Sequence, residues 1–152
     1  MACQNNDVAS CVKHAEILCK ERGVRLTMQR KKVLEIINQH EQPLGAYEIL
    51  QKMDNSKRAV APPTVYRALD FLLEQGLIHR LETLHAFVGC HHPEHHHTGQ
   101  FLICNQCGQV EELEDNAIAD SLSDAAAALG FETEQRVVEL TGQCASCNNN
   151  HQ

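Results

Sequence analysis

The sequence PPTVYRALDFLLEQG occupies residues 62–76 and decides the fold of the first part of the chain. Proline is tolerated in the first turn of a helix, where its missing N–H would have no intrahelical partner in any case. Apolar residues then recur at helical spacing, and a glycine follows as a stop signal. The stretch predicts an amphipathic helix whose inward face carries Val65, Leu69, Leu72 and Leu73 and whose other face carries Thr64, Tyr66, Arg67 and Asp70.

Further helices are predicted before this stretch, and two strands after it. Residues 8–22 have helical periodicity, Thr27 can cap a second helix, and residues 46–53 form a short third one. Polar residues 54–58 form a connector. LIHRLE at 77–82 and AFVGC at 86–90 are strand candidates separated by a short turn, which predicts a hairpin. Helices followed by a two-stranded hairpin are the order of a winged helix-turn-helix domain.

The second part of the chain has a different pattern. Residues 91–100, HHPEHHHTGQ, are almost entirely polar and are predicted to form a linker. FLIC and QVEEL predict strands on either side of a turn, residues 115–129 predict an alanine-rich helix, and residues 131–140 predict one long last strand. The predicted class is α+β, with a winged helix-turn-helix domain at 1–90, a linker at 91–100 and a small α/β domain at 101–152.

Four of the eight cysteines form two C-x-x-C pairs, Cys104 with Cys107 and Cys144 with Cys147. The N-terminus does not resemble a secretion signal, and in a reducing compartment paired cysteines indicate a metal site rather than disulfides. Four thiolates form a closed tetrahedral zinc site without a position for catalytic water, so this zinc is predicted to be structural. The alternative is four unconnected buried thiols. Cys11 and Cys19 share a helical face and are interpreted as small buried hydrophobic residues, while Cys3 has no assigned role.

A second group of possible ligands is spread over the hairpin, the linker and the following strands. His79, Cys90, His97 and Glu112 offer two imidazoles, a thiolate and a carboxylate, which suit zinc. Periodicity alone does not favour His97 over its neighbours in the linker. For those neighbours a solvated histidine without a function is the alternative; they are His91, His92, His95 and His96.

The outer face of the helix at 62–76 carries candidates for binding double-stranded DNA. Arg67 lies near the N-terminal end, where a recognition helix contacts base edges, and its planar guanidinium can bond guanine at two acceptors. Tyr47 in the preceding helix is a second candidate, and Thr64 and Tyr66 could contact phosphate or thymine. Arg25, Arg30, Lys31 and Lys32 could neutralise phosphates. The alternative is an ordinary amphipathic helix with a solvated face.

The charge distribution favours the DNA interpretation although the formal net charge is −7. Residues 1–82 contain 12 Lys and Arg against 10 Asp and Glu, whereas residues 83–152 contain 1 against 10. A polyanionic partner is therefore expected for the first part only. No apolar run approaches the length of about 20 residues that a membrane span requires, so no membrane partner is expected.

Three motifs are similar to those of one known family. TMQR at 27–30, PPTVYRALDFLLEQGLIH at 62–79 and HTGQFLICNQCG at 97–108 resemble the ferric uptake regulator superfamily, and most of all its zinc uptake regulator branch. The resemblance runs from about Val24 to Cys147. It implies a cytoplasmic, homodimeric repressor of zinc uptake genes with a C-terminal dimerisation domain, which binds palindromic operator DNA when loaded with zinc.

The resemblance also implies two Zn²⁺ sites per chain. The structural site would consist of Cys104, Cys107, Cys144 and Cys147, and the regulatory site of His79, Cys90, His97 and Glu112. Tyr47 and Arg67 would contact bases. Two departures from the family pattern stand out: Met28 replaces a common proline, and the relatives that sense iron or peroxide have HHDHLIC where this chain has HHHTGQFLIC.

Three alternatives to a zinc-responsive repressor follow from the residues. An iron or peroxide sensor of the same family would need another late histidine, but no histidine lies between His97 and His151, and Cys90 favours zinc. A protein-interaction module stabilised by zinc would explain the four cysteines. It would not explain the positions of Arg67 and Tyr47 on the predicted helices. An enzyme acting on a small molecule is disfavoured, since no H-E-x-x-H motif or glycine-rich phosphate loop occurs. The operator, the zinc set-point and the number of dimers per operator do not follow from the sequence.

Overall fold

The computed structural model describes residues 7–54, 59–95 and 99–149. The chain forms two compact units, Met1–His96 and His97–Gln152. None of the helices in the described ranges combines the length and the apolar character that a membrane span requires.

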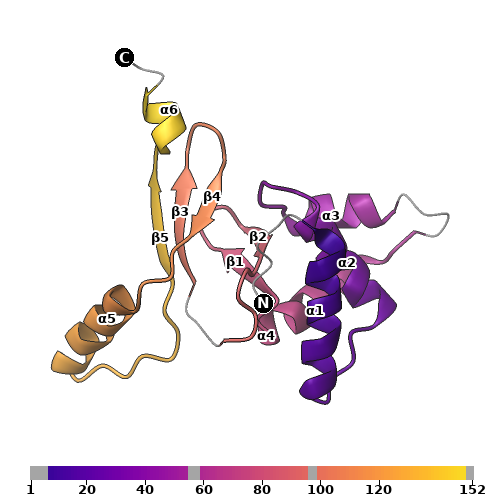
Figure 1. Cartoon of the computed structure of the whole chain (residues 1–152), viewed down its shortest axis with the longest axis horizontal. Helices are drawn as coiled ribbons and strands as arrows, with labels where there is room; N and C mark the ends of the chain where they lie inside the picture. The colour runs from indigo at the N-terminus through magenta and orange to yellow at the C-terminus, as the bar shows by residue number, and fades with distance from the viewer. Residues whose placement is uncertain (1–6, 55–58, 96–98, 150–152) are drawn as a thin grey trace. The chain divides into compact units, whose positions relative to one another are not determined.

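Four helices and a two-stranded wing make up the first unit (Figure 1). The elements are α1 (Val8–Glu21), α2 (Met28–Asn38), α3 (Ala46–Met53), α4 (Pro62–Glu74), β1 (Ile78–Leu81) and β2 (Ala86–Gly89). The predicted start signals of two helices are confirmed: Thr27 Oγ1 accepts a hydrogen bond from the Arg30 N–H at 3.4 Å, and α4 begins at Pro62. Asp54 ends α3, and its carboxylate accepts a hydrogen bond from the Val60 N–H at 2.7 Å. Most of the predicted connector, residues 55–58, lies outside the described residues.

The core of the first unit lies between the helices and the wing, to which Ile78 of β1 and Phe87 of β2 contribute. The predicted inward face of α4 is confirmed for Val65, Leu69 and Leu72, while Leu73 is half-buried. Cys19 is buried in this core, as interpreted from its helical face, and Cys11 is half-buried. The core also includes side chains from every helix of the unit, among them Val12, Val33, Leu34, Ile37, Ile49, Ala68 and Phe71.

The wing is an antiparallel hairpin fixed to the helices by a short bridge. Ile78 pairs with Gly89 and Leu81 pairs with Ala86. Leu44, in the loop before α3, exchanges two backbone hydrogen bonds with Phe87 of β2, at 2.8 and 3.1 Å. This bridge holds the wing against the helix-turn-helix, so the predicted winged helix-turn-helix order is confirmed.

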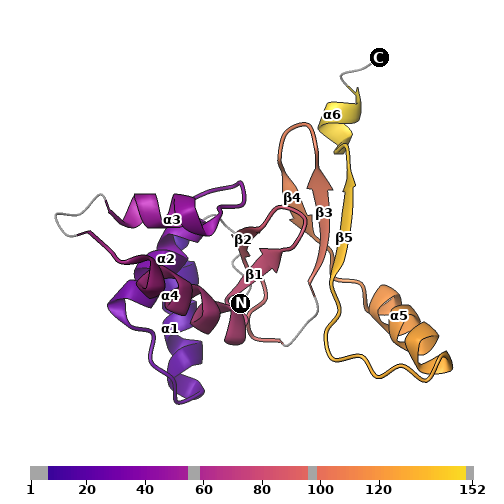
Figure 2. The same ribbon diagram turned by 180° about the vertical axis from the view of Figure 1, so that it is seen from behind.

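A three-stranded sheet and two helices form the second unit (Figures 1 and 2). The elements are β3 (Gln100–Cys104), β4 (Val110–Glu112), α5 (Asn116–Ala128), β5 (Val138–Gly142) and α6 (Ala145–Asn149). The strand order is β4-β3-β5, with β4 antiparallel and β5 parallel to β3. Gln100, which the sequence placed in the linker, is the first residue of β3, and its side-chain amide donates to the Asp115 carbonyl at 3.0 Å.

The prediction of one long last strand over residues 131–140 was wrong at its start. The strand begins at Val138, because its only partner among the described strands is the five-residue β3, whose first residue Gln100 pairs with Val138. Phe131 and Val137 are exposed, and without a neighbouring strand their backbone has no ladder to join. The strand instead extends two residues beyond the predicted end, to Gly142.

Helix α5 packs lightly on its own unit and none of its residues is buried. In both views it lies at the opposite end of β5 from α6 (Figures 1 and 2). Its contact with the chain before β5 includes Arg136, whose guanidinium donates to the Ala119 carbonyl at 2.8 Å and to the Ser123 hydroxyl. Arg136 is the one Lys or Arg in residues 83–152, so the single cation of that part of the sequence is bonded to α5.

Candidate metal sites and DNA-binding face

The parallel pairing of β3 and β5 brings the two cysteine pairs together. Cys104 is the last residue of β3 and pairs with Gly142, so Cys144 follows at the same end of the sheet. Cys107 lies in the turn after β3 and Cys147 lies in α6. All four sulfur atoms lie within 4.8 Å of one another. The site is therefore made from two sequence-distant segments that the sheet places side by side.

The geometry of these four cysteines fits a zinc ion. With Zn–S bonds of about 2.3 Å, a tetrahedral site separates its sulfur atoms by about 3.8 Å. The Cys107 and Cys144 sulfur atoms are 3.7 Å apart. The Cys144 N–H also points at the Cys104 sulfur, at 3.3 Å. N–H groups that donate to ligand sulfurs are a usual part of thiolate metal sites, because they stabilise the negative charge.

The cysteines of the cluster differ in how readily they ionise. Backbone N–H groups of Cys107 and Cys144 lower the pKa of Cys104 to about 6. The neighbouring Cys144 thiol and then burial raise the pKa of Cys147 to about 12. One sulfur thus ionises readily and another resists ionisation, since like charges this close repel each other. All four can be thiolates at neutral pH only when a metal ion compensates their charge.

The wing places the first two predicted ligands of the regulatory site next to each other. His79 is the second residue of β1 and pairs with Val88, and Cys90 directly follows β2. The Cys90 N–H donates to the Leu77 carbonyl at 3.0 Å, which extends the hairpin by one bond. A ring nitrogen of His79 and the Cys90 sulfur lie within 4.8 Å of each other. The hairpin therefore presents an imidazole and a thiol as a pair.

The other two predicted ligands belong to the second unit by sequence. Glu112 is the last residue of β4 and pairs with Phe101 of β3. His97 lies outside the described residues, together with His96. Of the other linker histidines, His92 is half-buried, whereas His91 and His95 are exposed.

The outer face of α4 carries the predicted DNA-binding side chains. Tyr66 is 57% exposed and Arg67 is exposed, while Thr64 is half-buried. Tyr47, the second residue of α3, is 70% exposed. Both tyrosine rings are therefore accessible to a partner molecule. This face therefore offers hydrogen-bond donors and aromatic rings that the fold does not use.

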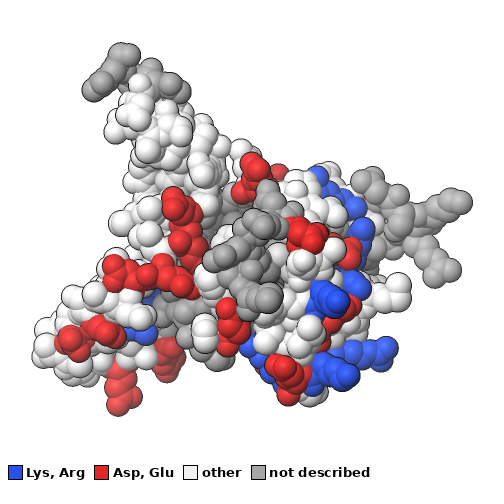
Figure 3. All heavy atoms as spheres, viewed as in Figure 1, with Lys and Arg blue, Asp and Glu red and all other residues white. Residues whose placement is uncertain are grey.

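Two of the residues predicted to bind phosphate, Arg30 and Lys31, also make contacts within the first unit. The Arg30 guanidinium lies 3.8 Å from the centre of the Phe71 ring and donates to the Arg25 carbonyl at 2.6 Å. Lys31 forms an ion pair with Glu16 at 2.7 Å. Arg25 and Lys32 are exposed. On the face drawn in Figure 3, Lys and Arg lie mainly over the first unit and Asp and Glu dominate the second, as expected from the sequence.

The fold is that of a winged-helix protein whose second unit brings four cysteines together as a candidate metal site. The chain belongs to the ferric uptake regulator family, whose sequence model matches residues 21–141. The zinc uptake regulation protein of Escherichia coli (strain K12) is 40% identical over 134 residues, which cover 88% of this chain and 78% of that protein. The family resemblance inferred from the three sequence motifs is thereby confirmed.

Two solved structures are similar over nearly the whole chain. A zinc uptake regulator complexed with zinc and DNA matches with a TM-score of 0.91 and 37% identity, covering 95% of this chain and 97% of that chain. Holo XcZur matches with a TM-score of 0.87 and 44% identity, covering 95% and 99%. The α+β class predicted from the sequence is the class of these proteins.

The exposed position of Arg67 leads to a first prediction. Replacing Arg67 by alanine should reduce the difference in binding free energy between the cognate duplex and one with a changed guanine by about 1–3 kcal/mol. The reason is that the two hydrogen bonds from the guanidinium to guanine are lost. The measurement is fluorescence anisotropy with both duplexes at one fixed salt concentration. Arg67→Lys is the matched control, since it keeps the charge without the planar fork. If Arg67→Lys discriminates like the native chain, Arg67 contacts phosphate and the assignment fails.

Proposed function

We propose that this chain is a zinc-responsive transcriptional repressor that binds palindromic operator DNA as a homodimer when loaded with zinc, and thereby controls zinc uptake genes. One observation carries the proposal: an imidazole and a thiol, His79 and Cys90, are paired on the wing of a DNA-binding domain. A thiolate beside an imidazole favours zinc over iron(II) or manganese(II). The similarity to a zinc uptake regulator complexed with zinc and DNA supports the same function.

The proposal assigns two zinc ions to each chain. Cys104, Cys107, Cys144 and Cys147 hold the structural ion, for which the sulfur geometry given above is the support. His79, Cys90, His97 and Glu112 hold the regulatory ion. These four residues would offer zinc two imidazoles, a thiolate and a carboxylate, which are ligand types that it prefers. His79 and Cys90 belong to the unit that carries the wing, and His97 and Glu112 belong to the unit that begins at His97. The regulatory ion would therefore link the proposed domains at 1–90 and 101–152 across the linker at 91–100.

Zinc dependence of DNA binding follows if the ligands meet only in the arrangement that fits the operator. Zinc then binds the DNA-competent state more tightly than the open one, and the difference sets how far it shifts the equilibrium. A coupling of 5- to 150-fold is typical of one such link. Linkage is reciprocal, so operator DNA should raise the affinity for regulatory zinc by the same factor. The side chains that read the duplex would be Arg67 and Tyr47, supported by Thr64 and Tyr66.

The second unit has the surface that a dimer would require. Strand β5 lies at the edge of its sheet, and apolar side chains before and within it are exposed. Exposed apolar groups of this extent mark interaction surfaces, and a second copy of the chain would cover them. The exposed apolar residues are Leu122 in α5, Leu129 at the end of α5, and Phe131, Val137 and Leu140, and each is 45–87% exposed.

The proposed function includes no catalytic step and no small-molecule substrate. The four-cysteine site has no open position at which water could be activated. Thiolate ligands and a DNA target both indicate a reducing, DNA-containing compartment, so the proposed location is the cytoplasm.

The experiment that tests the proposal measures DNA binding against buffered free zinc. Full-length protein that retains its structural zinc should bind operator duplex on the order of 5- to 150-fold more tightly once the regulatory site fills, by the coupling given above. The same titration with ferrous and manganous ions, under anaerobic conditions, should give a much smaller increase. Equal DNA affinity with and without added zinc would overturn the proposal. A larger response to ferrous ion would instead make the chain an iron regulator.

A further inference from the structure

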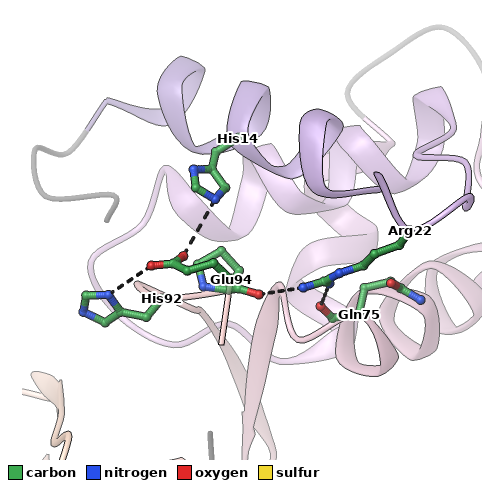
Figure 4. Close-up of polar contacts among 6 residues, drawn as sticks. His14, Arg22, Gln75, His92 and Glu94 are labelled. Atoms are coloured by element: carbon green, nitrogen blue, oxygen red, sulfur yellow. Dashed lines mark hydrogen bonds and ion pairs between the residues drawn. The ribbon is translucent and has the colours of Figure 1, made fainter. Parts of the chain in front are cut away.

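One arginine of the first unit holds the chain on both sides of the wing (Figure 4). Arg22 is the residue that ends α1. Its guanidinium donates one hydrogen bond to the Gln75 carbonyl at 2.7 Å and another to the Pro93 carbonyl at 2.9 Å. Gln75 precedes β1, where the chain enters the wing, and Pro93 follows β2, where the chain leaves it. The planar guanidinium can serve both acceptors at once, which the single ammonium group of a lysine does less well.

The first acceptor joins the proposed DNA-reading helix to the wing. Gln75 is the residue that ends α4, and only Gly76 and Leu77 separate it from β1. The last carbonyls of a helix lack intrahelical partners, and a cation near them interacts favourably with the helix dipole. The hydrogen bond from Arg22 therefore fixes the C-terminal end of α4 to the C-terminal end of α1.

The second acceptor lies in the segment that leaves the wing, and a carboxylate strengthens the attachment of this segment. Pro93 is buried, and the Glu94 carboxylate lies between two histidine rings (Figure 4). Its oxygens are 3.7 Å from Nε2 of His14, on α1, and 3.6 Å from Nδ1 of His92. The chain that leaves the wing is thus attached to α1 through both Arg22 and Glu94.

We propose that Arg22 is a positioning residue that makes the wing and α4 move as one body, and so carries the effect of regulatory zinc to the DNA-reading helix. This inference rests on the proposed function. The wing carries the zinc ligands His79 and Cys90, whereas α4 carries Arg67. Zinc on the wing can influence reading by α4 only if the two are rigidly connected, because coupling between sites is carried by rigid elements.

The other attachment of the wing lies elsewhere on the hairpin. The Leu44–Phe87 bridge holds the middle of β2 to the loop before α3. Without the Arg22 guanidinium, that bridge remains, but the wing can turn about its short connection to α4. Zinc should still bind, since its ligands are unchanged, but DNA affinity should rise less when it does. Residues that carry coupling between two sites typically change it by roughly 2- to 30-fold.

The test compares the operator affinity of full-length protein with and without regulatory zinc, while the structural zinc is retained. Arg22→Ala should lower the ratio of the two affinities by roughly 2- to 30-fold, and Arg22→Lys should lower it less. A cobalt(II) titration without DNA, followed by thiolate-to-cobalt absorption, should give native metal affinity for both variants. Lys20→Ala is the matched control: it removes an exposed positive charge from the last turn of α1 and should keep the native ratio.

Reciprocal linkage gives a second readout that a general loss of stability does not change. Operator DNA should raise the zinc affinity of Arg22→Ala less than that of the native chain, by the same factor by which the ratio falls. A folded Arg22→Ala protein with the native ratio would overturn the inference. So would an equal loss of DNA affinity with and without zinc, because Arg22 would then contact DNA or only support the fold.

A second variant covers the case in which Arg22→Ala does not fold. Glu94→Gln keeps the side-chain shape and removes the charge beside the two histidines, so the segment that leaves the wing is held less firmly. Its ratio should fall by a smaller factor, and a native ratio in both Glu94→Gln and Arg22→Lys would refute the role of Arg22. A native chain whose DNA affinity does not respond to zinc would instead overturn the proposed function, whatever the variants do.

Discussion

Replacing Cys147 by serine should remove the structural zinc and unfold the second unit while the first unit stays folded. Structural zinc sites of this kind contribute an apparent binding free energy of about 10–16 kcal/mol at neutral pH. That is as large as the total stability of a small domain, about 5–15 kcal/mol. The second unit has little else to stabilise it, since α5 buries no residue and β4 has three residues. The measurements are zinc content by elemental analysis and limited proteolysis, with cleavage expected only after residue 96.

Cys11→Ser is the matched control for this variant. Cys11 lies half-buried on α1, away from both cysteine pairs in the sequence, so the same chemical change there should keep zinc content and protease resistance at native values. A Cys147→Ser protein that keeps its full zinc content and a protected second unit would show that these four cysteines do not form the structural site.

Replacing Cys90 by serine should abolish zinc-dependent DNA binding and leave the dimer intact. Serine has nearly the size of cysteine, so the wing keeps its backbone bond from residue 90 to Leu77. Its hydroxyl stays protonated at neutral pH and is a poor zinc ligand, whereas thiolate binds zinc strongly. DNA affinity at saturating zinc should therefore fall to the zinc-free value, a loss on the order of 5- to 150-fold.

The Cys90→Ser experiment combines DNA binding with sedimentation velocity and zinc content. The dimer and one zinc ion per chain should persist, because the four-cysteine site is untouched. Cys11→Ser again serves as the control and should respond to zinc like the native chain. If Cys90→Ser still binds operator in a zinc-dependent way, the regulatory site does not use this thiol.

The parts of the fold that the sequence predicted are those encoded by local patterns. Thr27, Pro62 and the apolar spacing of Val65, Leu69 and Leu72 determine helix starts and faces within a few residues of themselves. The start of β5 could not be read in this way, because a strand extends only as far as its partner does, and β3 ends the pairing at Gln100. Gln100 itself appeared as linker, although its amide reaches the Asp115 carbonyl in the structure.

The candidate sites also differ in whether a local sequence pattern encodes them. Cysteine pairs carry their own spacing signal, so the four-cysteine site could be predicted, while the choice of His97 among the five histidines of residues 91–100 depended on family resemblance. Arg22 had no signal at all. It binds backbone carbonyls, which every residue possesses, and the two acceptors lie 53 and 71 positions away in the chain. The place of Arg30 beside Phe71 likewise appears only after folding.

The acidic balance of the second unit affects how this chain meets DNA. A duplex that approaches the second unit meets carboxylates, and the one guanidinium of residues 83–152 is already bonded to Ala119 and Ser123. The second unit therefore repels a duplex, because like charges raise the encounter barrier. The side chains that attract DNA are then those of the first unit, where 12 of the 13 Lys and Arg residues lie.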